Sequence, residues 1–299
     1  MNAKGLLRNG IYISKSSAAR RYTRSKGGDT LLFVFLTLAG LFSVLPLIYC
    51  VCTSFKPLDE LLIFPPRFFV RRPTIGNYTI LSDLMASLKV PLSRYVFNSI
   101  FTSTVTTAIY IIVSTMAAFV LSKGRVKGGK LIFWIVQFAL MFNTYTLAVP
   151  QYLIFSKLGI IDTYWIYILP QMASTLGVFL ATQYIEGYVP EALLEAARID
   201  GATSYKVYWS IIMPIIKPIW LTIMLFTFRD LWSIVPNGKI FSEQLKILPQ
   251  VATQITAGGT ARAGSAMAVT VIMMIPPIIV FLMTQSNVVE AMSSAGIKE

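Results

Sequence analysis

The sequence contains no histidine, so the commonest general base, proton relay and metal ligand is missing from all 299 residues. Its two cysteines, Cys50 and Cys52, both lie inside one apolar run. We expect free thiols in a helix there, rather than a disulfide or a metal site. No pairing of a nucleophile with a base is visible in the sequence either. These absences argue against an enzyme that works inside the membrane.

Charged residues are also scarce, at 13% of the chain compared with about 25% in a soluble domain. Hydrophobic residues make up 55%, and the mean hydropathy is +0.67. Alternating apolar and polar strands of about ten residues, the mark of a membrane barrel, are absent from the sequence. The composition therefore predicts an all-α fold with several helices that cross a membrane.

Acidic residues are the rarer sign of charge, with 13 Asp and Glu against 26 Lys and Arg, and the net charge is +13. Such a balance in a soluble protein suggests nucleic acid as a partner. The basic residues of this chain, however, gather beside apolar runs, as they do in membrane proteins. We therefore expect membrane lipid, and no nucleic acid, as a partner.

Six apolar runs are each long enough to cross about 30 Å of hydrocarbon. They cover residues 30–53, 96–121, 131–155, 164–185, 211–232 and 264–284. Basic residues are concentrated in the arm 1–29 and in the loop 122–130. The positive-inside rule then predicts cytoplasmic N- and C-termini. The arm 1–29 is interpreted as a basic cytoplasmic flank, with a mitochondrial transit peptide as the alternative, and residues 30–299 as one transmembrane domain.

Two long loops are predicted on the external side. The first, 54–95, contains Pro65 and Pro66, which forbid a regular helix at that point. The second, 233–263, contains Gly258 and Gly259, and we expect it to be ordered only in part.

The most polar helical stretch lies between the fourth and fifth apolar runs, at residues 190–201. Pro190 and Glu191 suit the start of a helix, and Gly201 suits its end. Thr203 or Ser204 is placed to cap a second short helix. An apolar face is expected from Ala192, Leu193, Ala196, Ala197 and Ile199. Two short helices at the cytoplasmic surface suit docking into a groove of a partner protein, although a plain amphipathic surface helix fits the same pattern.

Residues 124–130 have the spacing of a nucleotide-binding P-loop. Leu131 follows them, where a P-loop needs Ser or Thr for Mg²⁺, and an apolar helix precedes them instead of a strand. We interpret the stretch as a basic cytoplasmic turn.

Residues 195–214 resemble the EAA motif of the permease subunits of ABC importers. The matching residues are Glu195, Ala196 and Ala197, then Asp200 and Gly201, then Ile211, Met213 and Pro214. Met213 stands where the family usually has Leu. Flanking residues, among them Asn77-Tyr78, Asn98-Ser99 and 158–163, are similar to the carbohydrate-uptake branch, the half related to the smaller maltose-importer subunit. The similarity covers about residues 30–299.

The resemblance implies a type I ABC importer permease fold and a non-catalytic subunit that moves a sugar or oligosaccharide. It implies no cofactor in this chain, with ATP and Mg on partner ATPase subunits. The implied partners are a second homologous permease, two ATPase subunits and an extracellular solute-binding protein, at the cytoplasmic membrane of a prokaryote. The residues implied to couple to the ATPase are Glu195, Ala196, Ala197, Asp200, Gly201 and Pro214.

Candidate residues of the solute path lie in the third and fifth runs. Arg229 and Asp230 are ionisable residues at membrane depth, which normally face a cavity or a partner; an ion pair between subunits or a snorkelling Arg fits them as well. Trp232 stands where the branch often has Trp-Asn, and Asn143 and Tyr145 where it often has Pro or Gly. A secondary transporter driven by an ion gradient is the alternative. The absence of His, the scarcity of intramembrane acids and the lack of a visible repeat count against it.

Overall fold

The computed structural model describes residues 26–124, 126–142, 146–236 and 238–296. Every regular element within these residues is a helix, in agreement with the predicted fold class. The chain divides into two compact units, Met1–Tyr49 and Cys50–Glu299, and each is treated by itself. The functional candidates all lie in the second unit.

The helices follow one another along the chain with short connections. Their bounds are α1 Lys26–Ser54, α2 Leu58–Leu61, α3 Gly76–Ser87, α4 Leu92–Lys123, α5 Gly129–Ala139, α6 Ala148–Lys157, α7 Trp165–Met172, α8 Leu176–Tyr188, α9 Glu191–Ile199, α10 Ser204–Val207, η1 Tyr208–Ile212, α11 Met213–Ile215, α12 Lys217–Ser233, η2 Glu243–Leu245, α13 Leu248–Thr256, η3 Thr260–Arg262 and α14 Ala263–Gly296.

The first predicted span, 30–53, is confirmed as the helix α1. Its apolar window has no buried residue. An apolar helix with such an exposed window suits a lipid surface or a partner chain.

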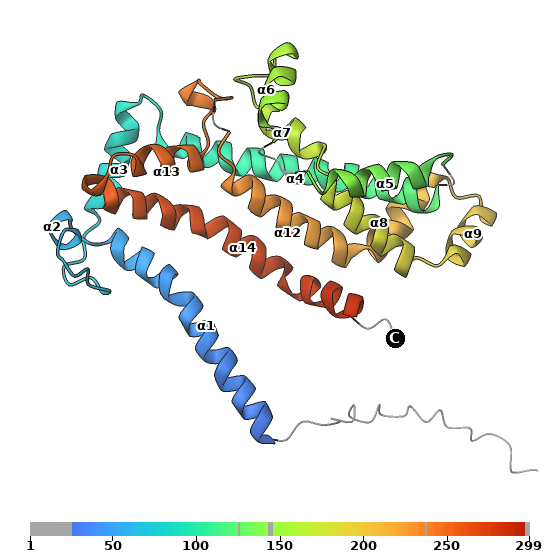
Figure 1. Cartoon of the computed structure of the whole chain (residues 1–299), viewed down its shortest axis with the longest axis horizontal. Coiled ribbons are helices and arrows are strands. Elements are labelled where there is room, and N and C mark those ends of the chain that lie inside the picture. Colours follow the sequence, from blue (N-terminus) through green and yellow to red (C-terminus); the bar gives the residue numbers. More distant parts are fainter. Residues whose placement is uncertain (1–25, 125, 143–145, 237, 297–299) are drawn as a thin grey trace, which may run out of the picture. The chain divides into compact units, whose positions relative to one another are not determined.

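The 32-residue helix α4 is central to the second unit. It packs against α7, α8 and α12, while α14 packs against α12, α13 and α3 (Figure 1). At about 1.5 Å per residue, α4 is about 48 Å long, so its two ends belong to different regions of the molecule. It ends at Gly124, where a Cβ would lie 2.4 Å from the Val120 carbonyl oxygen.

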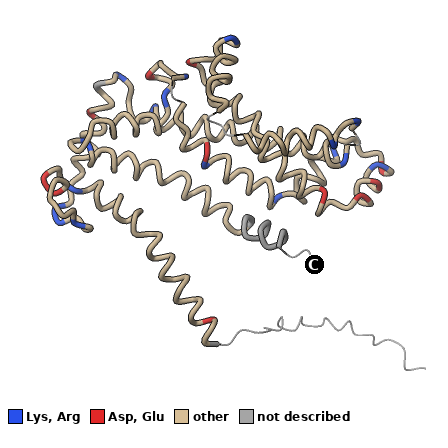
Figure 2. Tube along the Cα trace, in the orientation of Figure 1, with Lys and Arg blue, Asp and Glu red and all other residues tan. Residues whose placement is uncertain are grey.

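Within the described residues, four helices are long and apolar enough to cross a membrane. They are Gly27–Ser54, Leu92–Lys123, Trp165–Tyr188 and Thr260–Ser286. A fifth results if the bent pair Ser204–Ile215 and Lys217–Ser233 counts as one span. The charged residues of the second unit lie mainly in its loops and near helix ends (Figure 2).

The third predicted span, 131–155, is not one continuous helix in the structure. The stretch contains α5 and α6, and the residues between them include three outside the described ranges. Pro150 explains the interruption, because it lacks the N–H that would bond to the carbonyl of residue 146. A proline is tolerated in the first turn of a helix, and Pro150 occupies the third position of α6.

The fifth predicted span, 211–232, contains a bend of 80°. The bend is at Ile216, and α12 starts with Lys217 and Pro218. Pro214 and Pro218 both lack the N–H that continues a helical ladder, which weakens the helix on both sides of Ile216. Most of the predicted span is therefore α12, while residues 211–215 belong to the segment before it.

Candidate functional site

The predicted helix between the fourth and fifth spans is α9. Pro190 precedes it as the N-cap, with an extended backbone at ψ 139°, rather than standing at its first helical position. Glu191 places an acid in the first turn, where the positive end of the helix dipole stabilises it.

The end of α9 is a Schellman motif, as the glycine in the sequence predicted. The N–H of Gly201 donates to the Arg198 carbonyl at 3.0 Å, and the N–H of Ala202 donates to the Ala197 carbonyl at 2.9 Å. Gly201 has a φ of +74°, in the left-handed region that favours glycine. The chain therefore reverses sharply at this residue.

Thr203 caps the next helix, also as predicted. Its hydroxyl accepts a hydrogen bond from the Lys206 N–H at 3.3 Å, at the start of α10. The chain then continues through one turn of π-helix, η1, and the short α11. The π-helix is a rare form that often marks functional positions.

Tyr208, the first residue of η1, ties this segment to α4. Its hydroxyl lies 2.8 Å from the hydroxyl of Thr115. Thr115 donates to the Ile111 carbonyl at 2.6 Å, so it accepts from Tyr208. The Tyr208 ring also lies 6.2 Å from that of Phe119, between centroids. The contact thus combines a buried hydrogen bond with aromatic packing.

The inner face of α9 is formed by Leu194 and Ala197, which are both buried. They belong to one apolar cluster with Ile185 of α8, Ile212 of η1 and Ala118 of α4. The apolar face predicted from the sequence did not include Leu194. Of the five residues predicted for that face, only Ala197 is buried.

The outer face of α9 and its turn is exposed and mixes charge with apolar surface. Exposed residues here are Ala192, Leu193, Glu195, Ala196, Ile199, Asp200, Gly201, Tyr205 and Pro214. Ile199 has 86% of its surface exposed. Five of the six predicted coupling residues are therefore exposed, and Ala197 is buried.

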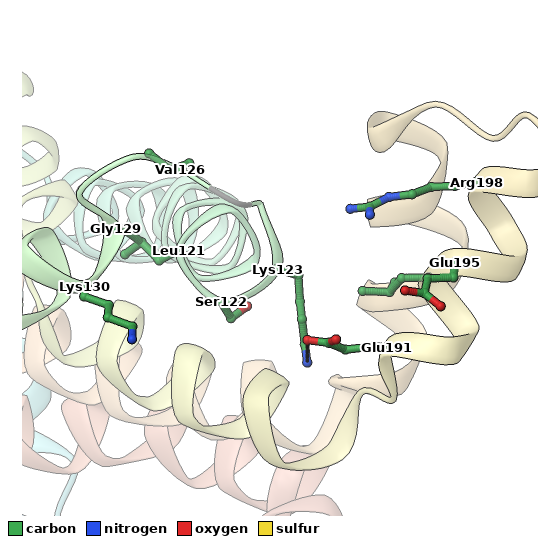
Figure 3. A pocket seen from close by; sticks show the side chains of 10 residues that line it. Leu121, Ser122, Lys123, Val126, Gly129, Lys130, Glu191, Glu195 and Arg198 are labelled. Atoms are coloured by element: carbon green, nitrogen blue, oxygen red, sulfur yellow. Dashed lines mark ion pairs between the residues drawn. The ribbon is translucent and has the colours of Figure 1, made fainter.

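A pocket of about 240 Å³ lies between α9 and the junction of α4 with α5 (Figure 3). Glu191, Glu195 and Arg198 line it from α9, and Lys123 and Lys130 line it from the junction. The Lys123 side chain is only 9% exposed, and its Nζ lies 3.9 Å from the Glu191 carboxylate, which is 79% exposed. This ion pair is a second link between α9 and α4.

The P-loop-like stretch 124–130 connects two helices, as expected for a basic turn. Gly124 follows α4, and Gly128, with φ +81°, precedes α5. The strand that a nucleotide-binding loop requires does not precede it.

The predicted solute-path residues are only partly brought together. Arg229 and Asp230 are exposed on α12. Trp232 is buried, and its Nε1–H donates to the Met273 carbonyl of α14 at 2.8 Å. Asn143 and Tyr145 lie outside the described residues.

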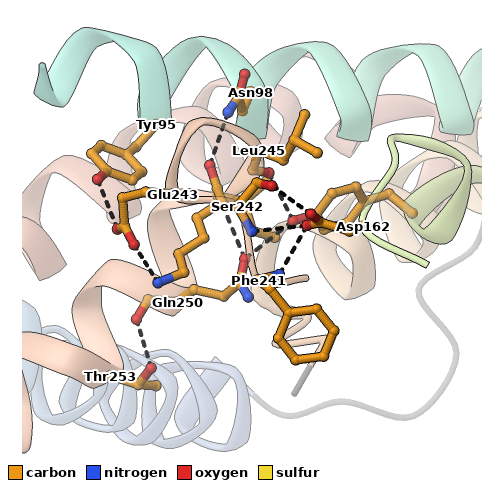
Figure 4. Close-up of polar contacts among 12 residues, drawn as sticks. Tyr95, Asn98, Asp162, Phe241, Ser242, Glu243, Leu245, Gln250 and Thr253 are labelled. Atoms are coloured by element: carbon orange, nitrogen blue, oxygen red, sulfur yellow. Dashed lines mark hydrogen bonds and ion pairs between the residues drawn. The ribbon is translucent and has the colours of Figure 1, made fainter. Parts of the chain in front are cut away.

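At the other end of α4, polar side chains fasten the segment 236–250, which sequence analysis expected to be ordered only in part (Figure 4). Asn98 is fully buried and donates through Nδ2 to the carbonyls of Gln244 and Lys246, at 2.8 and 2.9 Å. The Tyr164 hydroxyl donates to the Asn98 Oδ1 at 2.8 Å. Tyr95 donates to the Glu243 carboxylate at 2.9 Å.

Asp162 holds the same segment from the loop before α7. Its carboxylate accepts from the backbone N–H groups of Phe241 and Ser242, at 2.9 and 2.8 Å, and from the Ser242 hydroxyl. These hydrogen bonds, chiefly those of Ser242, lower the pKa of Asp162 below its ordinary value of 3.8. Burial lowers the pKa of the nearby Lys239 ammonium, which donates to Gln151 at 2.7 Å.

Among the described residues, no three Cys, Asp or Glu side chains gather as a metal site would require.

Comparison with known proteins gives several relatives but no matching family model. The chain is 30% identical to protein LplC of Bacillus subtilis (strain 168) over 210 residues, covering 69% of this chain and 67% of LplC. It is 25% identical over 270 residues to the putative ABC transporter permease protein ORF2 of Caldicellulosiruptor sp. (strain Rt8B.4), covering 89% and 96%. It is 27% identical over 273 residues to the arabinooligosaccharides transport system permease protein AraQ of Bacillus subtilis (strain 168), covering 90% and 94%.

A solved structure shares the fold. It is the crystal structure of a bacterial ABC transporter involved in the import of the acidic polysaccharide alginate. The TM-score is 0.68 and the identity 24%, over 88% of this chain and 98% of the other. ORF2 and AraQ are named as transport permeases, and an ion-gradient transporter is not favoured by these relatives.

Proposed function

We propose that a docking segment and its packing against α4 transmit the action of separate ATPase subunits to this chain. The chain belongs to the family of sugar-importing ABC transporter permeases. It is a non-catalytic membrane subunit that translocates a sugar or oligosaccharide, coupled to separate ATPase subunits. The proposal concerns the residues that receive the ATPase motion and the path by which it reaches the membrane helices.

Residues 188–214, the coupling segment, dock into a groove of an ATPase subunit. The outer face of α9 supports this assignment, because it offers Glu195, Ala196 and Asp200 beside exposed Ile199. An amphipathic helix that lays an apolar side into a groove is a common mode of recognition. The Gly201 turn fixes the angle between α9 and α10, so the segment presents one shape to its partner.

Motion of the coupling segment reaches α4 through the inner face. Leu194 and Ala197 pack into the cluster that also contains residues of α4, α8 and η1. Tyr208 adds the buried hydrogen bond to Thr115, and Glu191 adds the ion pair to Lys123. A close-packed contact of this kind moves as a body, because packed interiors deform little. The single observation that carries the proposal is this two-sided segment, exposed outward and packed against α4 inward.

The full assembly contains a second homologous permease, two ATPase subunits with ATP and Mg, and an extracellular solute-binding protein. It lies in the cytoplasmic membrane of a prokaryote. The chain crosses the membrane six times, with α5 and α6 as parts of one span and both termini in the cytoplasm. The basic arm 1–29 and the basic junction 122–130 support this orientation. ATP-driven closure of the ATPase pair moves the bundle between inward-open and outward-open states.

The solute path includes Arg229 and Asp230, together with Asn143, Tyr145 and Trp232. The first two are charged residues exposed on α12, a membrane-crossing helix, which supports a cavity-facing or partner-facing role. The names of similar proteins cover both an uncharged cargo, arabinooligosaccharides, and an acidic one, alginate. A sugar is therefore the proposed cargo class.

The coupling role is tested by the double variant Glu195→Lys/Gly201→Pro. Proline cannot adopt the left-handed φ of residue 201, and lysine reverses the exposed charge of residue 195. We expect uptake of radiolabelled sugar to be abolished and ATPase pull-down to be lost, while the amount of chain in the membrane fraction stays unchanged.

The matched control is Glu186→Lys/Gly159→Pro. Glu186 is an exposed acid on α8, and Gly159 has a φ of +67° outside the coupling segment. This variant should retain ATPase pull-down. Normal uptake by the Glu195→Lys/Gly201→Pro chain would refute the coupling role.

A further inference from the structure

The membrane span that contains α7 and α8 is interrupted at residues 173–175, and a small cavity of about 20 Å³ opens there. Its polar lining comes from Tyr110, Gln171, Ser174, Thr227 and Asp230, and the remaining lining residues are glycine or apolar. Three separate elements, α4, α7 and α12, and the break itself supply these polar groups. Interrupted membrane helices frequently mark binding sites in transporters.

The backbone groups freed by the break are satisfied by Tyr110. Its hydroxyl donates to the Ser174 carbonyl at 3.1 Å and accepts from the Gly177 N–H at 2.7 Å. A Cβ at position 177 would lie 2.6 Å from this hydroxyl, so the contact requires glycine. The other polar groups of the cavity are therefore not needed to repair the helix.

Asp230, Gln171 and Thr227 remain available. Among the described residues, no hydrogen bond or ion pair reaches the Asp230 carboxylate, the Gln171 amide or the Thr227 hydroxyl. An ionised carboxylate at membrane depth is costly unless a partner or water compensates it. A carboxylate, an amide and a hydroxyl without partners around one cavity indicate a ligand that both donates and accepts hydrogen bonds.

The size and charge of the cavity define the ligand. A space of about 20 Å³ holds one water-sized group, such as a hydroxyl, but not a sugar ring. A carboxylate accepts from a hydroxyl, while an amide and a second hydroxyl complete the pairing. The cavity lining contains no Lys or Arg, and Arg229 is not one of the lining residues. A sugar acid placed here would meet the charge of Asp230, and the adjacent Arg229, whose charge acts on that carboxylate, does not line the cavity.

We propose that this cavity is a sugar-hydroxyl subsite that favours uncharged sugars over sugar acids, with Asp230 and Gln171 as the contact residues. The proposal rests on the proposed function as a sugar permease and adds the charge class of the cargo. The hydroxyl enters the cavity, and the ring stays in the path outside it.

The first test measures the electrostatic field at the cavity without any sugar. A Phe226→Cys reporter, at an exposed residue that lines the cavity, is placed in a Cys50→Ala/Cys52→Ala background of the assembled transporter. Its reaction rate is compared for a cationic and an anionic methanethiosulfonate of similar size. We expect the cationic reagent to react faster, and Asp230→Asn to reduce this ratio about fivefold or more. Glu186→Gln, which removes an acid outside the cavity, should leave the ratio unchanged. An unchanged ratio in Asp230→Asn would overturn the assignment of Asp230.

The second test measures protection of the same reporter by sugars. Arabinotriose should slow labelling, whereas trigalacturonate should not, and Asp230→Asn should allow trigalacturonate to protect. Gln171→Ala should weaken protection by arabinotriose while leaving the ratio of the two reagents intact. Equal protection by both sugars, or by neither, would refute the subsite.

ATP-dependent uptake is followed in the same preparation of the assembled transporter. Uptake that requires ATP, combined with no protection, contradicts only the subsite. Uptake that persists without ATP contradicts the proposed function itself, whatever the labelling shows.

Discussion

The first turns of α4 are fastened by hydrogen bonds from Tyr95 and Asn98 to the 236–250 segment, whereas its last turns pack mainly by apolar contact against the coupling segment. Hydrogen bonds fix both distance and direction, and apolar packing fixes mainly proximity. The hydrogen bonds at the N-terminal end of α4 therefore hold this end and the bonded loop in one fixed geometry. The second end stays attached to the coupling segment, whose outer face is the proposed docking surface for the ATPase.

The exposed surfaces differ in the same way. The coupling segment leaves Ile199 almost fully exposed, with Leu193 and Tyr205 also at the surface. Apolar surface of this kind marks an interaction site. At the other end, the carbonyls of residues 244–246 are bonded by Asn98 and Tyr167, and the N–H groups of 241 and 242 are bonded by Asp162. Under the proposed function, rigidity at one end and a docking face at the other would make α4 a lever.

The largest effect is expected from Asn98→Leu, which tests the rigid end. Leucine leaves two carbonyls and the Tyr164 hydroxyl without their partner in a buried site. Because each unsatisfied buried group costs about 1–3 kcal/mol, we expect a loss of about 3–5 kcal/mol in the free energy of unfolding. Thermal unfolding of the purified transporter measures it, and proteolysis of the 236–250 segment should become faster.

The control for this change is Thr256→Val, which removes an exposed hydroxyl bond to the Ala252 carbonyl in the neighbouring helix α13. We expect a change below about 0.5 kcal/mol there. ATPase pull-down should survive Asn98→Leu, because the coupling segment is at the other end of α4. Its loss would mean that the two ends do not behave as separate regions.

The coupling end was largely readable from the sequence. Its signals are local: Gly201 stops α9, Thr203 caps α10, and the motif residues lie within 20 positions of one another. The buried face was misjudged, because α9 carries apolar residues on several sides and the choice of face depends on α4, α8 and η1. Only the packing partners bring Leu194 inward.

The rigid end was not readable, because its contacts join residues far apart in the chain. Asn98 bonds to residues 146 and 148 positions later, and Asp162 to residues 79 and 80 positions later. No short spacing encodes such pairs. The breaks within the third and fifth predicted spans had a visible signal that hydropathy averaging hides: Pro150 accompanies the break in the third, and Pro214 with Pro218 accompanies the bend in the fifth.

An intermediate effect is expected at the coupling end from Thr115→Val, which keeps the shape of Thr115 but removes the hydroxyl that accepts from Tyr208. We expect a stability loss of about 1 kcal/mol and a fall in sugar moved per ATP of about fivefold, the change that one buried hydrogen bond allows. Parallel measurements of uptake and ATP hydrolysis give this ratio.

Thr115→Ser is the matched control, because it keeps the hydroxyl and removes only a methyl group. It should restore the ratio even if it melts slightly lower than the native chain. Tyr208→Phe should reproduce the Thr115→Val result, and combining the two should add little, because both remove the same bond. Equal coupling ratios in Thr115→Val and Thr115→Ser would contradict transmission through this hydrogen bond.

The smallest effect is expected from Asp162→Asn, which tests whether charge contributes to the rigid end. The lowered pKa of Asp162 means that its stabilisation is fully present above pH 3.8 and is lost as the pH falls through the lowered value. Asparagine tolerates the left-handed φ of +59° at this residue and can still accept from the backbone. We therefore expect a loss below about 1 kcal/mol at pH 7, as for other surface charges. Melting temperatures of the two chains should converge as the pH falls below 3.8, because only the native carboxylate becomes protonated there. A difference that stays constant down to pH 3 would show that geometry, and not charge, holds the 236–250 segment at Asp162.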